Sequence, residues 1–467
     1  MNINLFEKFY FIGIGGIGMS ALARYFHAKG FQVSGYDRSP SHLTDELIEE
    51  GIDIHFDVNH IPEFIQNAHP HSLMVVYTPA VSLTSPQLTF FKSKKWHVMK
   101  RADLLGLVTE DAYTIAISGT HGKTTTSCIL AHVLKECDVY CTAFLGGIST
   151  NFNSNLLLSE KGNIVVVEAD EYDRSFLKLT PDIVIITSVD ADHTDVYDDK
   201  NDLISTFQKF IKNIKPGGML LVNKSINVEF EIPQEVFMMT YSAQIKADNI
   251  ATHLHVENGC QLFNVNYKDI LPGQVYEFEL KQIKLKLPGL HNVENALAAM
   301  IIASNLGANA EEIKAAIESF SGVKRRFEYH ANGEYIYIDD YAHHPEEIKA
   351  TLQTAKILFP QRKLTVVFQP HLFSRTKDFF QEFAKSLSLA DEVLLLDIYP
   401  AREKPIKGVT SKMILDIISH SKKNIIDKKN VVAELINPKR ELLLTLGAGD
   451  IDQFVEPLTK HYKNESR

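Results

Sequence analysis

The chain has 467 residues, of which 45% are hydrophobic and 23% charged, and this length predicts about three domains. Its formal net charge of -10 at pH 7 disfavours nucleic acid or an anionic membrane as a partner. The four cysteines form no CxxC pair, and no apolar run approaches the roughly 20 residues that span a bilayer. We therefore expect a cytoplasmic chain with reduced thiols, as a monomer or a homodimer.

The first segment alternates between apolar runs and helical patterns. An apolar run at 9–14 is followed by glycines, a helical pattern and a second strand at 31–36. This order predicts a βαβ opening, and the apolar run at 73–77 continues the alternation. We place a first domain at 1–109.

A glycine motif joins the first strand to the first helix. Gly13, Gly15 and Gly18 have the GxGxxG spacing, which lets a backbone approach a diphosphate at a helix N-terminus. Asp37 ends the next strand, where dinucleotide-binding domains keep an acid that contacts a ribose. Taken alone the motif predicts NAD, and a tight turn without a ligand is the alternative.

The middle segment, 110–321, is predicted as a second α/β domain. Three buried-strand runs are typical of a parallel sheet: they lie at 164–167, 183–187 and 219–222. Between 245 and 287, short alternating runs predict hairpins added to the edge of this sheet. A helical pattern follows at 293–303.

The segment SGTHGKTTT lies between a strand and a helix and has the pattern of a phosphate-binding loop. We expect its amides and Lys123 to hold the β- and γ-phosphates of a nucleotide, while the Thr124 hydroxyl reaches Mg²⁺. The loop departs from GxxxxGK[ST], because Ile117 stands at the first glycine position and the glycine falls at Gly119.

Carboxylates follow two strands of the middle segment. Glu168 directly follows the run IVVV, and His193 lies in SVDADHTD after the next strand. Ligands of parallel sheets bind at the carboxyl ends of the strands, so both side chains are candidates to hold Mg²⁺ beside a triphosphate. Solvated turn residues are the alternative for each acid.

Further polar clusters follow. In LPGLHNVENA, the Asn295 amide can recognise a nucleobase edge. The third segment, 322–467, repeats the strand and helix alternation and is predicted as a smaller α/β domain. It contains DDYAHHPEE, where helix capping is the alternative to function for Asp340 and His344, and FQPHLFSRTKDF, where Arg375 can clamp a carboxylate.

The chain resembles the Mur ligase family, which includes folylpolyglutamate synthase. The resemblance extends over essentially the whole chain and lies in GTHGKTTT, EADEYD, ADHTD, GLHNVEN, DDYAHHP and FQPHLFSRT, in this order. It implies an α/β architecture of three domains: Rossmann-like, central P-loop ATPase-like and C-terminal Rossmann-like. The implied reaction is the ATP- and Mg²⁺-dependent ligation of L-alanine to UDP-N-acetylmuramate, for peptidoglycan synthesis. The glycine loop then holds a UDP diphosphate rather than NAD.

The resemblance also implies roles for individual residues. The ATP site contains Gly119, Thr120, His121, Gly122, Lys123, Thr124, Thr125, His291 and Asn295. The metal ligands are Thr124, Glu168 and His193. The UDP-sugar site contains Gly13, Gly15, Gly16, Gly18 and Asp37. The catalytic group comprises Lys123, His193, Arg326, His343 and His344, and the amino-acid side of the cleft contains Tyr341, His371 and Arg375.

Two positions qualify these assignments. Arg326 resembles an interdomain arginine near phosphate, and Arg325 is the alternative for that role. Leu372 stands where many family members have an additional arginine, which leaves carboxylate capture to Arg375.

Other functions stay open at this point. Within the family, a murein peptide ligase would add a recycled tripeptide to the same UDP-sugar, although the opening GIGGIGMSALAR favours alanine. Outside the family, an NAD-dependent dehydrogenase would leave Lys123 and Thr124 without a role. A P-loop motor or regulatory ATPase would leave the first domain without one.

Overall fold

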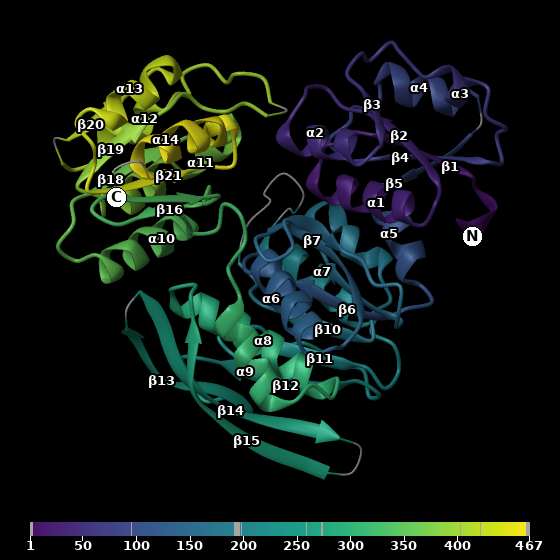
Figure 1. Cartoon of the computed structure of the whole chain (residues 1–467), viewed down its shortest axis with the longest axis horizontal. Helices are drawn as coiled ribbons and strands as arrows, with labels where there is room; N and C mark the ends of the chain where they lie inside the picture. Colours follow the sequence, from purple (N-terminus) through teal and green to yellow (C-terminus); the bar gives the residue numbers. More distant parts are fainter. Residues whose placement is uncertain are drawn as a thin grey trace. The chain divides into compact units, whose positions relative to one another are not determined.

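Three β-sheets with helices packed on them make up the chain (Figure 1). The structure is a computed structural model that describes residues 3–463, apart from residues 95, 191–196, 198, 258, 272–273, 402 and 421. Its contacts divide the chain into two units. Unit 1 comprises Met1–Lys286 and Leu290–Gly322, and unit 2 comprises Leu287–Gly289 and Val323–Arg467.

The first sheet of unit 1 is parallel, with the strand order β3-β2-β1-β4-β5. Its strands are β1 (Lys8–Ile12), β2 (Gln32–Tyr36), β3 (Asp53–His55), β4 (Leu73–Tyr77) and β5 (His97–Lys100). The helix α1 (Ile17–Ala28) connects β1 to β2, which confirms the predicted βαβ opening. β1 ends before the predicted residue 14, because Gly13 has a φ of 86° and turns the chain out of the strand.

The second sheet of unit 1 has ten strands in the order β15-β14-β13-β12-β11-β10-β6-β9-β7-β8. The strands at its centre are β6 (Tyr113–Ser118), β9 (Ile164–Glu168), β10 (Ile183–Ile186), β11 (Met219–Asn223) and β12 (Phe237–Ser242). The strands toward its two edges are β7 (Cys141–Ser149), β8 (Ser154–Leu157), β13 (Asn249–Glu257), β14 (Cys260–Leu271) and β15 (Gln274–Leu285). The antiparallel strands β13 to β15 extend one edge, as predicted from their alternating pattern.

Helices pack on the second sheet and connect its strands. α6 (Lys123–Glu136) follows β6, and α8 (Leu290–Asn305) contains the predicted helix at 293–303. The first two residues of α8, Leu290 and His291, are exposed. The rest of the helix is buried almost throughout, because small and apolar side chains occupy most of its positions. The remaining helices of unit 1 are α2 (His42–Glu49), α3 (Glu63–Gln66), α4 (Pro86–Ser93), α5 (Arg101–Thr109), α7 (Lys200–Ile211) and α9 (Ala310–Ser319).

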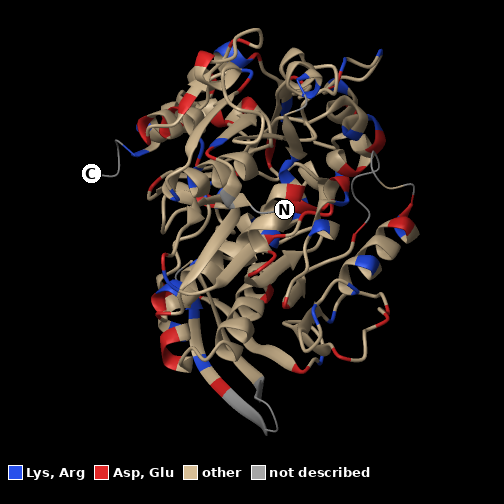
Figure 2. Cartoon of the chain, turned by 90° about the vertical axis from the view of Figure 1, so that its right-hand side faces the viewer, with Lys and Arg blue, Asp and Glu red and all other residues tan. Residues whose placement is uncertain are grey.

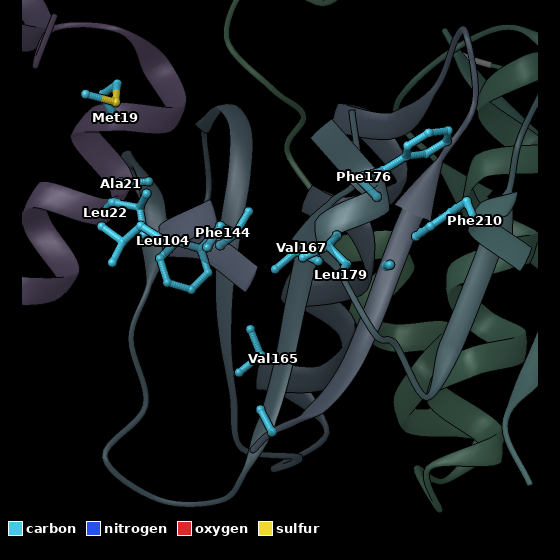
Figure 3. Packing of buried hydrophobic residues seen from close by; sticks show 14 of the residues in the cluster. Met19, Ala21, Leu22, Leu104, Phe144, Val165, Val167, Phe176, Leu179 and Phe210 are labelled. Atoms are coloured by element: carbon cyan, nitrogen blue, oxygen red, sulfur yellow. The ribbon is translucent and has the colours of Figure 1, made fainter. Parts of the chain in front are cut away.

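An apolar seam joins α1 of the first sheet to β7 of the second sheet. Phe144 on β7 is buried beside Leu22 and Leu104 (Figure 3). Its ring also lies 5.3 Å from that of Tyr25 on α1. Burying a phenylalanine side chain contributes about 1.5–3 kcal/mol, so this seam stabilises the contact between the two sheets' layers.

Unit 2 contains a six-stranded sheet with the order β16-β17-β21-β18-β19-β20. Its strands are β16 (Glu328–Asn332), β17 (Ile336–Asp340), β18 (Leu364–Phe368), β19 (Glu392–Leu395), β20 (Lys423–Ile425) and β21 (Leu442–Leu446). β16 pairs antiparallel at the edge, and the other pairs are parallel. The helices are α10 (Pro345–Leu358), α11 (Phe373–Leu387), α12 (Lys412–Ile417), α13 (Val431–Ile436) and α14 (Val455–Lys463).

Acidic and basic residues are interspersed along the helices and loops (Figure 2). Among the described residues, no helix has the length and apolar character that crossing a membrane requires.

Candidate active site

The phosphate-binding loop connects β6 to α6 and depends on two glycines. Gly119 has a φ of 134°, and a Cβ there would lie 2.2 Å from the Thr187 hydroxyl oxygen. Gly122 has a φ of 84°, and a Cβ there would lie 2.6 Å from Oδ1 of Asn295. Both positions therefore require glycine. The shifted glycine of this motif is explained by the close approach of the chain after β10 to Gly119.

Backbone contacts hold the loop against the residues that follow β10. The Thr120 amide donates to the Ser188 carbonyl oxygen at 3.1 Å, and the His121 amide donates to the Ser188 hydroxyl at 2.8 Å. Thr125 is buried in the first turn of α6. The loop is thus shaped before any nucleotide binds.

Lys123 begins α6 and points to a carboxylate. Its ammonium donates to Oε2 of Glu171 and to the Gly119 carbonyl oxygen, both at 2.7 Å. Burial alone would lower the pKa of Lys123, but the carboxylates of Glu171, Asp170 and Glu168 outweigh it and raise the pKa. Lys123 is therefore a fixed positive charge at the phosphate loop.

Thr124 and Glu168 form the second polar pair of the loop. The Thr124 hydroxyl donates to Oε2 of Glu168 at 2.9 Å. A Cβ at Gly146 would lie 1.9 Å from the same oxygen, so glycine leaves the space that this carboxylate occupies. Hydroxyl and carboxylate oxygens are the donors that Mg²⁺ prefers, and the pair fits this ion. Within the described part of the chain, no group of three or more His, Cys, Asp or Glu side chains could hold a metal, and the predicted ligand His193 lies outside the described residues.

A pocket of about 250 Å³ is lined by Glu168 of this pair and by the glycine motif of the first sheet. One wall comes from Gly16, Gly18 and neighbouring residues of α1, and the other contains Gly146 and Glu168. Arg101, the first residue of α5, also lines the pocket, and its guanidinium would lie 2.8 Å from a Cβ at Gly18. The glycine motif of the first sheet and the Glu168 carboxylate of the second thus line one pocket within unit 1.

Asp37 contacts the glycine motif itself. Its Oδ2 accepts a hydrogen bond from the Gly15 amide at 2.7 Å, and Oδ1 accepts one from the Arg38 amide at 2.6 Å. The acid that was predicted to contact a ribose therefore also shapes the loop.

The two candidate nucleobase residues differ in their surroundings. Asn295 is buried on α8, and its Oδ1 accepts a hydrogen bond from the Thr126 hydroxyl at 3.1 Å. His291 is exposed near the start of the same helix. Asn295 therefore lies beside the phosphate loop, and the ring of His291 is accessible to a ligand.

In unit 2, the two neighbouring arginines have different environments. Arg325 donates from Nε to Oδ2 of Asp339 at 3.0 Å and from Nη2 to the Gly447 carbonyl oxygen at 2.6 Å. The Arg326 guanidinium lies 5.4 Å from the Tyr341 ring centroid. Since Arg325 is held by a fully buried carboxylate, we retain Arg326 as the phosphate-side candidate.

The predicted amino-acid side forms an aromatic cluster in unit 2. The ring of His343 lies 5.3 Å from that of Tyr341 and 5.9 Å from that of His371, which stacks on Tyr399. Burial lowers the pKa of His343; Glu347 opposes this effect, and Arg375 adds to it. Burial and the Arg375 charge therefore both favour the neutral form of the His343 ring.

His344 and Leu372 start the two helices beside this cluster. The His344 amide donates to Oε2 of Glu347 at 3.2 Å, at the N-terminus of α10. Leu372 precedes α11 with a φ of 70° and is only 8% exposed. Leu372 is therefore a buried apolar side chain and adds no positive charge to this cluster.

Sequence reasoning missed four residues of these clusters. Glu171 was seen only as part of an acidic run, and Arg101 lies outside every motif. Gly146 and Tyr399 have no sequence signal, because their importance comes from contacts with Glu168 and His371. The available signal for Arg101 was its position directly after β5, since ligands bind at the carboxyl ends of parallel strands.

The chain belongs to the Mur ligase family. Residues 8–113 match its "Mur ligase family, catalytic domain", residues 117–303 its "Mur ligase middle domain", and residues 325–449 its "Mur ligase, glutamate ligase domain". The chain is 47% identical over 460 residues to the UDP-N-acetylmuramate–L-alanine ligase of Porphyromonas gingivalis. This match covers 97% of this chain and 99% of that protein. It is 45% identical over 468 residues to the enzyme of that name from Christiangramia forsetii, over 100% of both chains.

Solved structures confirm the three-domain architecture. The UDP-N-acetylmuramate-alanine ligase of Thermotoga maritima superimposes with a TM-score of 0.79 at 31% identity, covering 98% of this chain and 99% of that one. A murein peptide ligase from Psychrobacter arcticus superimposes with a TM-score of 0.70 at 21% identity, with the same coverage, and shares the fold. The predicted fold class is therefore correct.

Proposed function

We propose that this chain is a cytoplasmic ligase that joins L-alanine to the lactyl carboxylate of UDP-N-acetylmuramate. ATP is converted to ADP and phosphate, and the product is the UDP-N-acetylmuramoyl-L-alanine used for peptidoglycan. The observation that carries this proposal is a pocket lined both by the glycine motif of one sheet and by the Glu168 carboxylate of the other. A two-substrate ATP ligase needs such a shared site, whereas a dehydrogenase or a simple ATPase does not.

In the first step, a lactyl carboxylate oxygen attacks the γ-phosphorus of ATP. A new oxygen–phosphorus bond forms, the bond to the bridging oxygen breaks, and ADP leaves. Lys123 would exchange Glu171 for phosphate oxygens, and its charge would stabilise the transferring group. Arg101, at the opposite wall, would attract the anionic acceptor substrate.

Thr124 and Glu168 would hold Mg²⁺, with His193 as a further predicted ligand. When bound, this ion neutralises charge on the phosphate oxygens. Gly119 to Thr125 would surround the phosphates, and His291 and Asn295 would contact the adenosine. Gly13, Gly15, Gly16 and Gly18 would bind the UDP diphosphate, with Asp37 beside them.

In the second step, the neutral amine of alanine attacks the acyl carbon. The resulting tetrahedral intermediate loses phosphate and one proton from the amine nitrogen, and the amide is formed. We assign the amino-acid side to Tyr341, His343, His344, His371 and Arg375 of unit 2, and we assign Arg326 to charge neutralisation during phosphoryl transfer. A guanidinium suits both tasks, because it binds carboxylate or phosphate bidentately.

Measurement of ADP release tests the proposed reaction. We expect ADP only when UDP-N-acetylmuramate and L-alanine are both present with ATP. Comparable release with the recycled tripeptide in place of alanine would favour a murein peptide ligase, and release from ATP alone would favour a simple ATPase. With oxygen-18 in the lactyl carboxylate, one label should appear in the released phosphate, whereas unlabelled phosphate would contradict the acyl phosphate route.

A further inference from the structure

A side chain of the second sheet binds the first turn of α1. Asn155 on β8 donates through Nδ2 to the Ile17 carbonyl oxygen at 2.6 Å and to the Ser20 hydroxyl at 2.8 Å. Its Oδ1 accepts a hydrogen bond from Nη1 of Arg24 at 2.5 Å. Asn155 is fully buried, so both ends of its amide group are bound to α1.

Arg24 is itself fixed by two carboxylates. Its guanidinium donates to Glu46 at 2.9 Å and to Glu50 at 2.6 Å, in and just after α2. Arg24 is only 7% exposed, and a buried guanidinium is stable only while its partners stay in place. We call the Arg24 and Asn155 side chains, with their mutual hydrogen bond, the clasp.

Asn155 of the clasp lies on the hairpin that forms one wall of the pocket. β7 and β8 pair antiparallel, and β7 carries Gly146 against the Glu168 carboxylate. The opposite wall begins at Gly16 and Gly18, next to the carbonyl oxygen that Asn155 binds. The clasp therefore fixes the two walls of the pocket relative to each other.

We propose that Arg24 and Asn155 are positioning residues, which hold the UDP-sugar site at the distance from the nucleotide site that phosphoryl transfer requires. This inference rests on the proposed function. The apolar seam between α1 and β7 keeps the two layers in contact, but apolar packing has no direction. The directional bonds of Asn155 supply the register of α1, and a displacement of the reacting groups by about 1 Å can cost about 100-fold in rate.

Asn155→Ala tests the clasp, with Asn151→Ala as the matched control. Asn151 lies in the turn of the same hairpin, but it bonds the Ser319 carbonyl oxygen and the Ser321 amide instead of α1. We expect Asn155→Ala to lower kcat about 10- to 100-fold at saturating substrates, with the KM for ATP changed less than about threefold. Asn151→Ala should keep kcat within about twofold of the unmodified chain.

Two further variants separate positioning from general damage. Asn155→Asp keeps an oxygen for Arg24 but loses the donors to α1, so it should be as slow as Asn155→Ala. Arg24→Gln combined with Asn155→Ala should be no slower than the slower single variant, because the two side chains act as one unit. An unchanged kcat in Asn155→Ala, an equal loss in Asn151→Ala, or additive losses in the double variant would overturn the proposal.

Hydrogen exchange provides a readout that does not depend on the reaction. Backbone amides in the first two turns of α1 should exchange faster in Asn155→Ala than in the unmodified chain. In Asn151→Ala their exchange rates should be unchanged. Unchanged exchange at α1 in Asn155→Ala would refute the clasp even in an active enzyme. An unmodified chain that fails to ligate alanine would refute the proposed function instead, while this exchange measurement still decides whether the clasp orders α1.

Discussion

The ammonium of Lys123 lies 2.7 Å from a carboxylate oxygen of Glu171, and that carboxylate is fully buried. The lysine that is proposed to bind ATP phosphates is therefore neutralised by the protein before ATP arrives. In the proposed reaction, phosphate oxygens would replace Glu171 as its partner. Removing either residue alone would leave a buried charge without its counterion, which destabilises a fold strongly.

This pairing predicts separate effects on stability and turnover. We expect Lys123→Met to abolish most turnover and to lower the free energy of unfolding by about 3–5 kcal/mol. Adding Glu171→Gln should restore most of the stability and none of the turnover, because the uncompensated carboxylate is gone while the phosphate-binding charge is still missing. Thermal unfolding and ADP release measure the two effects.

A control for the Lys123 and Glu171 pair is available on the surface of the same unit. Glu231 pairs with Lys212 at 3.5 Å and is 84% exposed, so Glu231→Gln should change neither stability nor turnover measurably. Near-normal turnover in Lys123→Met would remove this lysine from the reaction.

The Thr124 and Glu168 pair predicts a dependence on Mg²⁺. In Glu168→Gln, the Mg²⁺ concentration for half-maximal turnover should rise by about tenfold, because one anionic oxygen donor is lost. Gly146→Ala should shift it in the same direction, since the added methyl group would displace the Glu168 carboxylate. Glu160→Gln, at an exposed acid after β8, serves as the control. An unshifted Mg²⁺ titration in both pocket variants would argue against Glu168 as a ligand.

The sequence predicted the strands of the parallel sheets well, because strands buried on both faces are apolar along their whole length. β4 matches its predicted range, 73–77, and is buried almost throughout. Short, half-buried strands such as β3 and β20 were not predicted, since three residues are too few to show a hydrophobic pattern. The domain limits at residues 109 and 321 stay predictions.

The site residues that could be predicted from the sequence are those that belong to a local motif. Lys123 and Thr124 follow from the phosphate loop alone, because loop, strand and helix are adjacent in the chain. Glu171 and Asn155 depend on contacts across 48 and 131 residues of chain, with Lys123 and Arg24 respectively. No local pattern reports such pairings.

The two adjacent arginines of unit 2 predict opposite phenotypes. Arg325→Ala should lower the stability of unit 2 by about 3–5 kcal/mol, because it leaves Asp339 fully buried without its counterion. Arg326→Ala should lower kcat while stability changes by less than about 1 kcal/mol, because its guanidinium lies over the face of the Tyr341 ring. Hydrogen exchange of unit 2 peptides and steady-state kinetics measure these effects. The reverse pattern would make Arg325 the phosphate-side residue.

Asp340 predicts how the stability of unit 2 depends on pH. Burial raises its pKa to about 6; the Arg326 charge and hydrogen bonds from the Phe327 and Ala342 amides oppose this effect. A carboxyl group whose pKa is higher in the folded state binds its proton more tightly there. Its contribution to stability is therefore greatest in acid and falls as the pH rises toward 6, above which it is constant.

Comparison with Asp340→Asn isolates this contribution. Between about pH 4.5 and about pH 7, the unmodified chain should lose about 2 kcal/mol of unit 2 stability relative to Asp340→Asn, because asparagine does not titrate. Native-state hydrogen exchange of β17 and α10 peptides gives the free energies of opening at each pH. Asp416, which is exposed and pairs with Lys412 on α12, provides a control, and Asp416→Asn should follow the unmodified chain at every pH. A pH-independent difference between the unmodified chain and Asp340→Asn would show that the Asp340 carboxyl group titrates near its ordinary value.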